Sequence, residues 1–174
     1  MNTGPANPNV DAIRRSVQKS YNELNQLIDG PLASLDPHKL YDAPVENEWS
    51  IMQNLAHVVE IMPYWGNEIE KLVASPGQNF GRTMQHEGRL QAIREHSSDT
   101  LEQVKAALPG SYARLQEVLS KLRDSDLELT GIHSRFGEKS LGWFIEEFVT
   151  QHLINHVEQI RMCLAAVVDK KGDE

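Results

Sequence analysis

Four long segments of this sequence carry apolar residues at spacings of three and four, and this feature constrains the fold more than any other. An α-helix places residues at that spacing on one face, so each segment predicts an amphipathic helix with a buried stripe. In the first segment, residues 10–28, the stripe consists of Ile13, Val17, Tyr21, Leu24 and Ile28. The turn residues Asp29-Gly30-Pro31 end this helix.

The second helix has the clearest start signal. Ser50 and Gln53 have the spacing of a capping box, in which each side chain bonds a free backbone N–H of the first turn. We therefore expect a helix from Ser50 to about Val73. Pro63 falls inside it and removes one backbone donor, which predicts a kink near Val59.

A polar connection over residues 78–89 is the longest crossover in the chain, and a short helical piece follows it from Leu90. The third long helix covers residues 101–122, with a break or kink expected at Pro109-Gly110. Residues 127–139 form a linker that could hold a short extended piece, and Ser140 is the expected N-cap of a last helix over residues 141–169. The pattern predicts an all-α four-helix bundle with a long connection between helices 2 and 3.

The length of 174 residues fits one domain with a core of its own. We place this domain at residues 10–169, between a flexible N-terminal arm (residues 1–9) and a flexible tail (residues 170–174). Both flanks are rich in polar or charged residues and offer little to bury.

The formal charge of -8, with 25 acidic against 17 basic side chains, argues against nucleic acid as a partner. The longest apolar runs are too short to span a bilayer, so no membrane association is expected. The single cysteine, Cys163, cannot form an internal disulfide, and the first residues lack the apolar stretch of a signal peptide. We expect a cytoplasmic protein in which Cys163 is a small core residue.

Three histidines are placed where the core should be. His152 and His156 are four residues apart on the inward face of the last helix, and His57 lies on the inward stripe of the second. A buried imidazole needs partners for both ring nitrogens, and one divalent cation would serve all three rings while keeping positions open for water or substrate. The alternative is three hydrogen-bonded core histidines without a metal.

The segment EWSIMQNLAHVVE (residues 48–60), followed much later by HLINHVEQI (residues 152–160), resembles the DinB-like superfamily of damage-inducible bacterial proteins. In that family a tryptophan-serine pair caps the second helix, and three histidines bind a metal. The matching positions are His57, His152 and His156. The resemblance implies a four-helix bundle, usually a homodimer, that holds a divalent ion such as zinc or nickel. Some relatives are transferases or isomerases that use bacillithiol, mycothiol or glutathione.

Several other residues are weaker candidates for a role in catalysis. Glu60 and Tyr64 lie one or two turns from His57, and His133 precedes the last helix on a loop with Arg135. Each has a simpler explanation, as a packing residue or a solvated loop residue. Glu158 and Gln159 are candidates to orient the imidazoles, although residues of this kind usually face solvent.

The leading hypothesis is a metal-dependent enzyme acting on a small-molecule substrate. It would be a thiol-dependent S-transferase, with a low-molecular-weight thiol as co-substrate, or a metal-assisted hydrolase. The alternative from another class is a non-catalytic, dimeric bundle that binds a metal or another ligand.

Overall fold

The computed structural model describes residues 7–46 and 48–169. The expected tail and most of the expected N-terminal arm lie outside the described residues. The first helix, α1, spans Pro8–Leu27 and so begins two residues earlier than the sequence indicates. A residue far along the sequence caps its start: the Asp124 carboxylate accepts hydrogen bonds from the backbone N–H groups of Asn9 and Val10 at 3.1 and 2.9 Å.

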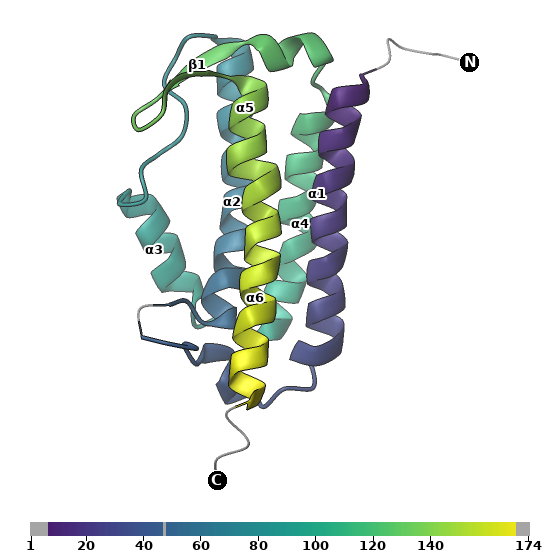
Figure 1. The fold of residues 1–174 in the computed structure, drawn as a ribbon, viewed down its shortest axis with the longest axis vertical. Coiled ribbons are helices and arrows are strands. Elements are labelled where there is room, and N and C mark those ends of the chain that lie inside the picture. The colour runs from purple at the N-terminus through teal and green to yellow at the C-terminus, as the bar shows by residue number, and fades with distance from the viewer. Residues whose placement is uncertain (1–6, 47, 170–174) are drawn as a thin grey trace, which may run out of the picture.

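Four long helical rods form the bundle, as predicted. They are α1, α2 (Ile51–Ala74), α4 (Leu101–Ser120) and a last rod made of α5 (Leu141–Ile145), η4 (Glu146–Thr150) and α6 (Gln151–Asp169). The rod α2 packs on both α4 and α6, and α1 packs on the same two rods from the opposite side (Figure 1). The apolar stripes of the four rods meet in one continuous core.

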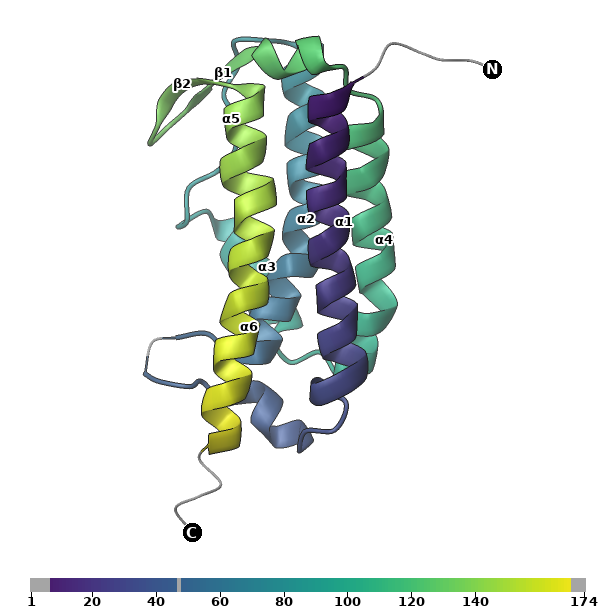
Figure 2. The same ribbon diagram turned by 45° about the vertical axis from the view of Figure 1, so that its right-hand side comes forward.

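The long connection after α2 determines the direction of the helices. It returns the chain along the outside of the bundle to the end where α2 began, so α2 and α4 run in the same direction (Figure 2). Midway it forms α3 (Glu87–His96), which packs against α2 outside the four-rod core. The helix α3 starts three residues earlier than expected, because Nδ1 of His86 accepts the N–H of Gly88 at 3.1 Å.

The predicted helix caps are confirmed. Ser50 and Gln53 form a reciprocal capping box at the start of α2, with bonds of 3.2 and 2.9 Å. Ser140 accepts the backbone N–H of Trp143 at 3.2 Å at the start of α5. These caps fix where the two rods that carry the histidines begin.

The prediction of a break at Pro109-Gly110 is wrong, because α4 runs without interruption through both residues. Pro109 and Lys105 are exposed, so the Lys105 carbonyl that loses its helical donor can bond water instead. Leu108 and Leu115 are fully buried on the other side of the helix and hold it in the core. The rod α2 is likewise continuous through Pro63, and the expected kink near Val59 does not interrupt it.

The last rod contains a π-helical turn, η4, that the sequence did not predict. The Thr150 hydroxyl donates to the Glu146 carbonyl at 3.0 Å and contacts the Glu146 carboxylate at 2.7 Å within this turn. The wider turn changes the rotation of the helix two residues before His152. Such turns are frequent at functional sites.

The linker before the last rod forms an antiparallel hairpin of β1 (Thr130–His133) and β2 (Gly137–Ser140), which agrees with the expected extended piece. Three shorter helical turns complete the described chain: η1 (Ile28–Leu32), η2 (Pro37–Tyr41) and η3 (Asp124–Glu128). Among the described helices none combines the length and apolar character needed to cross a bilayer.

Candidate metal centre

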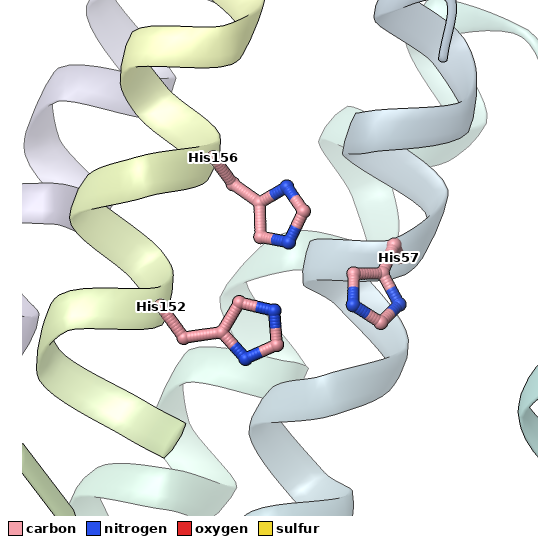
Figure 3. A group of neighbouring side chains, drawn as sticks. All are labelled: His57, His152 and His156. Carbon is pink, nitrogen blue, oxygen red and sulfur yellow. The ribbon is translucent and has the colours of Figure 1, made fainter. Parts of the chain in front are cut away.

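The structure brings the three predicted histidines together between α2 and α6. One ring nitrogen from each of His57, His152 and His156 lies within 4.8 Å of the others. The ring centroids are 4.7 to 5.4 Å apart, and the three rings face one another (Figure 3). His57 and His156 are 1% and 5% exposed, so this cluster is inside the protein rather than on its surface.

The orientation of His156 is fixed by a buried amide. Nδ2 of Asn54 donates to the Ser50 carbonyl at 3.0 Å, which turns the amide oxygen toward His156. That oxygen lies 2.9 Å from Nδ1 of His156 and can only accept, so Nδ1 carries the hydrogen. The lone pair of Nε2 is then free to bind an ion.

His57 is buried without a hydrogen-bond partner for either ring nitrogen among the described residues. Its Nδ1 lies 3.7 Å from Oε2 of Glu60, beyond hydrogen-bond distance, and Glu60 also pairs with Arg82. Burying two polar atoms without partners costs free energy. A cation bound by this ring would remove part of that cost, so the donor set fits a metal ion.

The three imidazoles are neutral near pH 7. Burial, reinforced by the charges of His156, His152 and two arginines, lowers the pKa of His57 to about 2. Burial and the neighbouring His152 lower the pKa of His156 to about 3. Burial also lowers the pKa of His152. A neutral imidazole is the form that binds a metal ion.

Two clefts open onto the cluster from different sides. The larger has a volume of about 920 Å³, and its walls include Val45, Trp49, Met162 and Cys163. The smaller has a volume of about 450 Å³, and its walls are formed by Trp65, Arg82, His133, Arg135, Phe136 and Phe148, among others. His57 and His152 belong to the walls of both, so the clefts meet at the histidines.

The weaker candidates have different surroundings. The guanidinium of Arg82 lies over the Tyr64 ring, 3.8 Å from its centre. Burial raises the pKa of the Tyr64 hydroxyl. Neither Tyr64 nor Glu60 is among the described wall residues of the two clefts. His133 lies on the wall of the smaller cleft, and its Nδ1 accepts the Arg135 backbone N–H at 3.1 Å. Glu60 is therefore behind His57, whereas His133 faces the cleft.

The other predicted residues are on the last rod. Glu158 is exposed and pairs with Arg161, away from the cluster, while Gln159 is on the wall of the larger cleft. Cys163 is a buried core residue, as expected, and its thiol donates to the Trp49 carbonyl at 3.3 Å.

Two residues beside the cluster were missed by the sequence analysis. Asn54 had a usable signal, since an amide on the inward face of α2 needs a buried partner. Arg89 had none, because α3 reaches the histidines only through the return of the long connection. Arg89 lies on the walls of both clefts, and its guanidinium is 5.3 Å from the centre of the Trp49 ring.

The fold is a four-helix bundle in which α2 and α4 run parallel, and three imidazoles cluster between α2 and α6. Together these features define a class of helical proteins with a candidate metal centre. A sequence model of the DinB superfamily matches residues 16–160, well over half of the chain. The chain therefore belongs to the DinB superfamily. A search of curated protein sequences gave no significant match.

Solved structures share the fold at low sequence identity. YfiT from Bacillus subtilis, reported as a probable metal-dependent hydrolase with an unusual four-helix bundle topology, superimposes with a TM-score of 0.73 at 12% identity, covering 94% of this chain and 90% of YfiT. A mycothiol-dependent maleylpyruvate isomerase gives 0.61 at 11% identity, covering 91% of this chain and 60% of the isomerase. The four-helix bundle protein TT2238 gives 0.52 at 19% identity, covering 92% and 98%. At these identities the likeness establishes the fold.

Proposed function

We propose that His57, His152 and His156 bind one divalent cation and that the protein is a metal-dependent enzyme. The observation that carries this proposal is the environment of His57. Its ring is 1% exposed, faces two other neutral imidazoles, and has no hydrogen-bond partner for either nitrogen in the described chain. A cation shared by the three rings accounts for all of these features.

The residues around the cluster support a site with fixed geometry. Asn54 holds His156 in the tautomer whose Nε2 is free, and the Glu60–Arg82 pair lies behind His57. Three imidazoles leave a tetrahedral ion one position for a ligand, as in catalytic rather than structural sites. When bound, the ion would act as a Lewis acid and lower the pKa of a coordinating water or thiol.

We favour transfer of a thiol to an electrophile as the reaction. Two clefts meet at the histidines, and an enzyme that joins two reactants needs room for both. A low-molecular-weight thiol would be the co-substrate, and the mycothiol-dependent isomerase of similar fold is consistent with this. Metal-assisted hydrolysis is the second candidate, supported by the description of YfiT.

Zinc and nickel are the ions we favour, since both accept imidazole nitrogen. The test is a conjugation assay with the zinc-loaded protein, several low-molecular-weight thiols and a chromogenic aryl chloride, together with a hydrolysis assay on an aryl ester. We expect turnover in one assay, lost in His152→Ala and after chelation. Absence of turnover in both, with the metal bound, would favour the non-catalytic metal-binding bundle instead.

One further expectation follows from the family, and another from the presence of a single cysteine in the sequence. We propose that the chain forms a homodimer and acts on its small-molecule substrate in the cytoplasm. Sedimentation equilibrium over a range of protein concentrations tests the first expectation. A constant monomer mass at all concentrations would contradict it.

A further inference from the structure

Arg89 is a half-buried cation beside the histidine cluster without an acidic partner. It forms no ion pair with any described residue, whereas the neighbouring Arg82 pairs with Glu60. One of its N–H groups donates from Nη1 to the Met84 carbonyl at 3.0 Å. The remaining N–H groups of the guanidinium are available to a ligand, because Arg carries five donors in a planar fork.

An aromatic side chain holds this guanidinium close to the imidazoles. Arg89 lies over the Trp49 ring at 5.3 Å, and the same indole contacts His57 edge-on at 5.0 Å and stacks on His156 at 6.0 Å. A rigid ring thus sets the distance between the cation and two proposed metal ligands. Since Arg89 is on the walls of both clefts, it can reach a ligand in either one.

The walls of the smaller cleft carry three arginines, Arg82, Arg89 and Arg135, against one glutamate, Glu147, in a chain whose formal charge is -8. The larger cleft has Arg89 and Glu48 on its walls. Burial and the charge of Arg82 lower the pKa of Arg89, and the smaller opposing effect comes from the charge of Glu60. A divalent ion at the histidines would add positive charge to this region. Like charges in a partly buried site repel strongly unless an anion lies between them.

We propose that Arg89 binds a carboxylate group of the ligand that occupies the free position of the metal ion, and so selects anionic ligands. This inference rests on the proposed function, because it assumes an ion at the histidines. The planar guanidinium matches a carboxylate with two parallel hydrogen bonds. The carboxylate could belong to the thiol or to the second reactant, and the experiment below separates these sources.

The probes are matched pairs in which a neutral polar group replaces the carboxylate. Cobalt(II) replaces the native ion, so that its visible spectrum reports thiol binding without any turnover. The first arm compares 3-mercaptopropionate with 3-mercaptopropan-1-ol, and the second compares benzoate with benzamide by NMR titration, with and without cobalt. In one arm we expect the carboxylate to bind about tenfold more tightly than its neutral partner. A charge-assisted hydrogen bond contributes a binding free energy of that order.

Two variants of Arg89 and one control variant test whether Arg89 causes the preference for the carboxylate. Arg89→Gln is expected to reduce it to less than about twofold, and Arg89→Lys to keep part of it, because lysine retains the charge but not the fork. Arg94→Gln is the matched control, since Arg94 is on the same helix but exposed and paired with Glu87. Thermal unfolding and circular dichroism establish that each variant is folded.

The outcomes separate the two proposals. If cobalt does not bind, the proposed metal site is wrong, and the metal-free benzoate arm still tests Arg89. If cobalt binds but neither arm shows a preference, or if the preference survives in Arg89→Gln, the role assigned to Arg89 is overturned. A preference confined to the thiol pair identifies the thiol as the source of the carboxylate, and one confined to benzoate identifies the second reactant.

Discussion

Nδ1 of His156 lies 2.9 Å from the amide oxygen of Asn54, whose Nδ2 bonds the Ser50 carbonyl at the start of α2. The residue that caps α2 is thereby connected to a proposed metal ligand on α6. Because the amide is held at both ends, its oxygen cannot turn away from the imidazole without losing a buried hydrogen bond. The helix start and the candidate site are parts of one local structure.

Replacement of Asn54 by leucine should weaken metal binding. The change keeps the approximate side-chain volume but leaves Nδ1 of His156 without an acceptor, so both tautomer and ring orientation are lost. Loss of such an outer partner typically weakens metal affinity about 10- to 100-fold. Competition with a chromophoric chelator measures the change.

The control for this variant is Asn25→Ala, because the side-chain amide of Asn25 donates to the Tyr21 carbonyl within α1. Wild-type affinity is expected there. Equal affinities in Asn54→Leu and the wild type would show that Asn54 does not orient the ligand.

The stability of the metal-free protein should fall as the pH drops below 6.5. Burial holds the pKa values of His57 and His156 at about 2 and about 3, below the 6.5 of an exposed imidazole. Below pH 6.5 the unfolded chain therefore binds protons that the folded chain excludes, and the folded state loses free energy relative to it. Each such histidine lowers the free energy of unfolding by about 1.4 kcal/mol between pH 7.5 and 5.5.

Urea denaturation of chelator-treated protein at these two pH values measures the effect. The groups that face His57 from the packed elements are His152, His156, Glu60, Arg82 and Arg89, and all remain in the His57→Gln variant. This variant should lose the part of the pH dependence that His57 contributes. An unchanged pH dependence in His57→Gln would mean that the buried ring is not what excludes the proton.

Gly81→Ala should destabilise the protein by about 1 to 2 kcal/mol through its backbone alone. Gly81 has a φ of 78°, and a Cβ there would lie 3.1 Å from the Trp65 ring, which adds a steric cost. Gly110→Ala is the opposite case, because nothing lies within 4 Å and the residue is inside α4. It should stabilise by up to about 1 kcal/mol. Chemical denaturation checks both, and a Gly81→Ala variant as stable as wild type would show that the positive φ at this position carries no cost.

Added zinc should raise the midpoint of thermal unfolding of the wild type. Binding to the native state alone stabilises it by about 2.7 kcal/mol when the free ion is at 100 times its dissociation constant. The shift should vanish in His156→Ala and persist in His86→Ala, an exposed histidine on the long connection. A shift of equal size in both variants would place the zinc elsewhere on the protein.

The features of the fold and of the candidate site that depend on local residue spacing could be predicted from the sequence. The caps at Ser50 and Ser140 and the inward phase of His57 follow from a few neighbouring residues, and the structure bears them out. The helix over Pro109 could not be predicted, because its continuity depends on burial of residues on either side.

The surroundings of the histidines were also beyond local reasoning. The π-helical turn before His152 and the approach of Arg89 depend on how distant segments pack. The spacing of residues in the sequence does not indicate that α3 packs against α2. Of the polar residues around the cluster, only Asn54 had a local signal that was overlooked.

Elemental analysis of protein purified without chelator tests the central claim most directly. The wild type should contain about one equivalent of a divalent metal per chain, since one ring nitrogen from each of three histidines lies within 4.8 Å of the others. His152→Ala should contain almost none, and the exposed control His38→Ala should match the wild type. A wild type that is free of metal, and that does not take up zinc or nickel when either is added, would contradict the account.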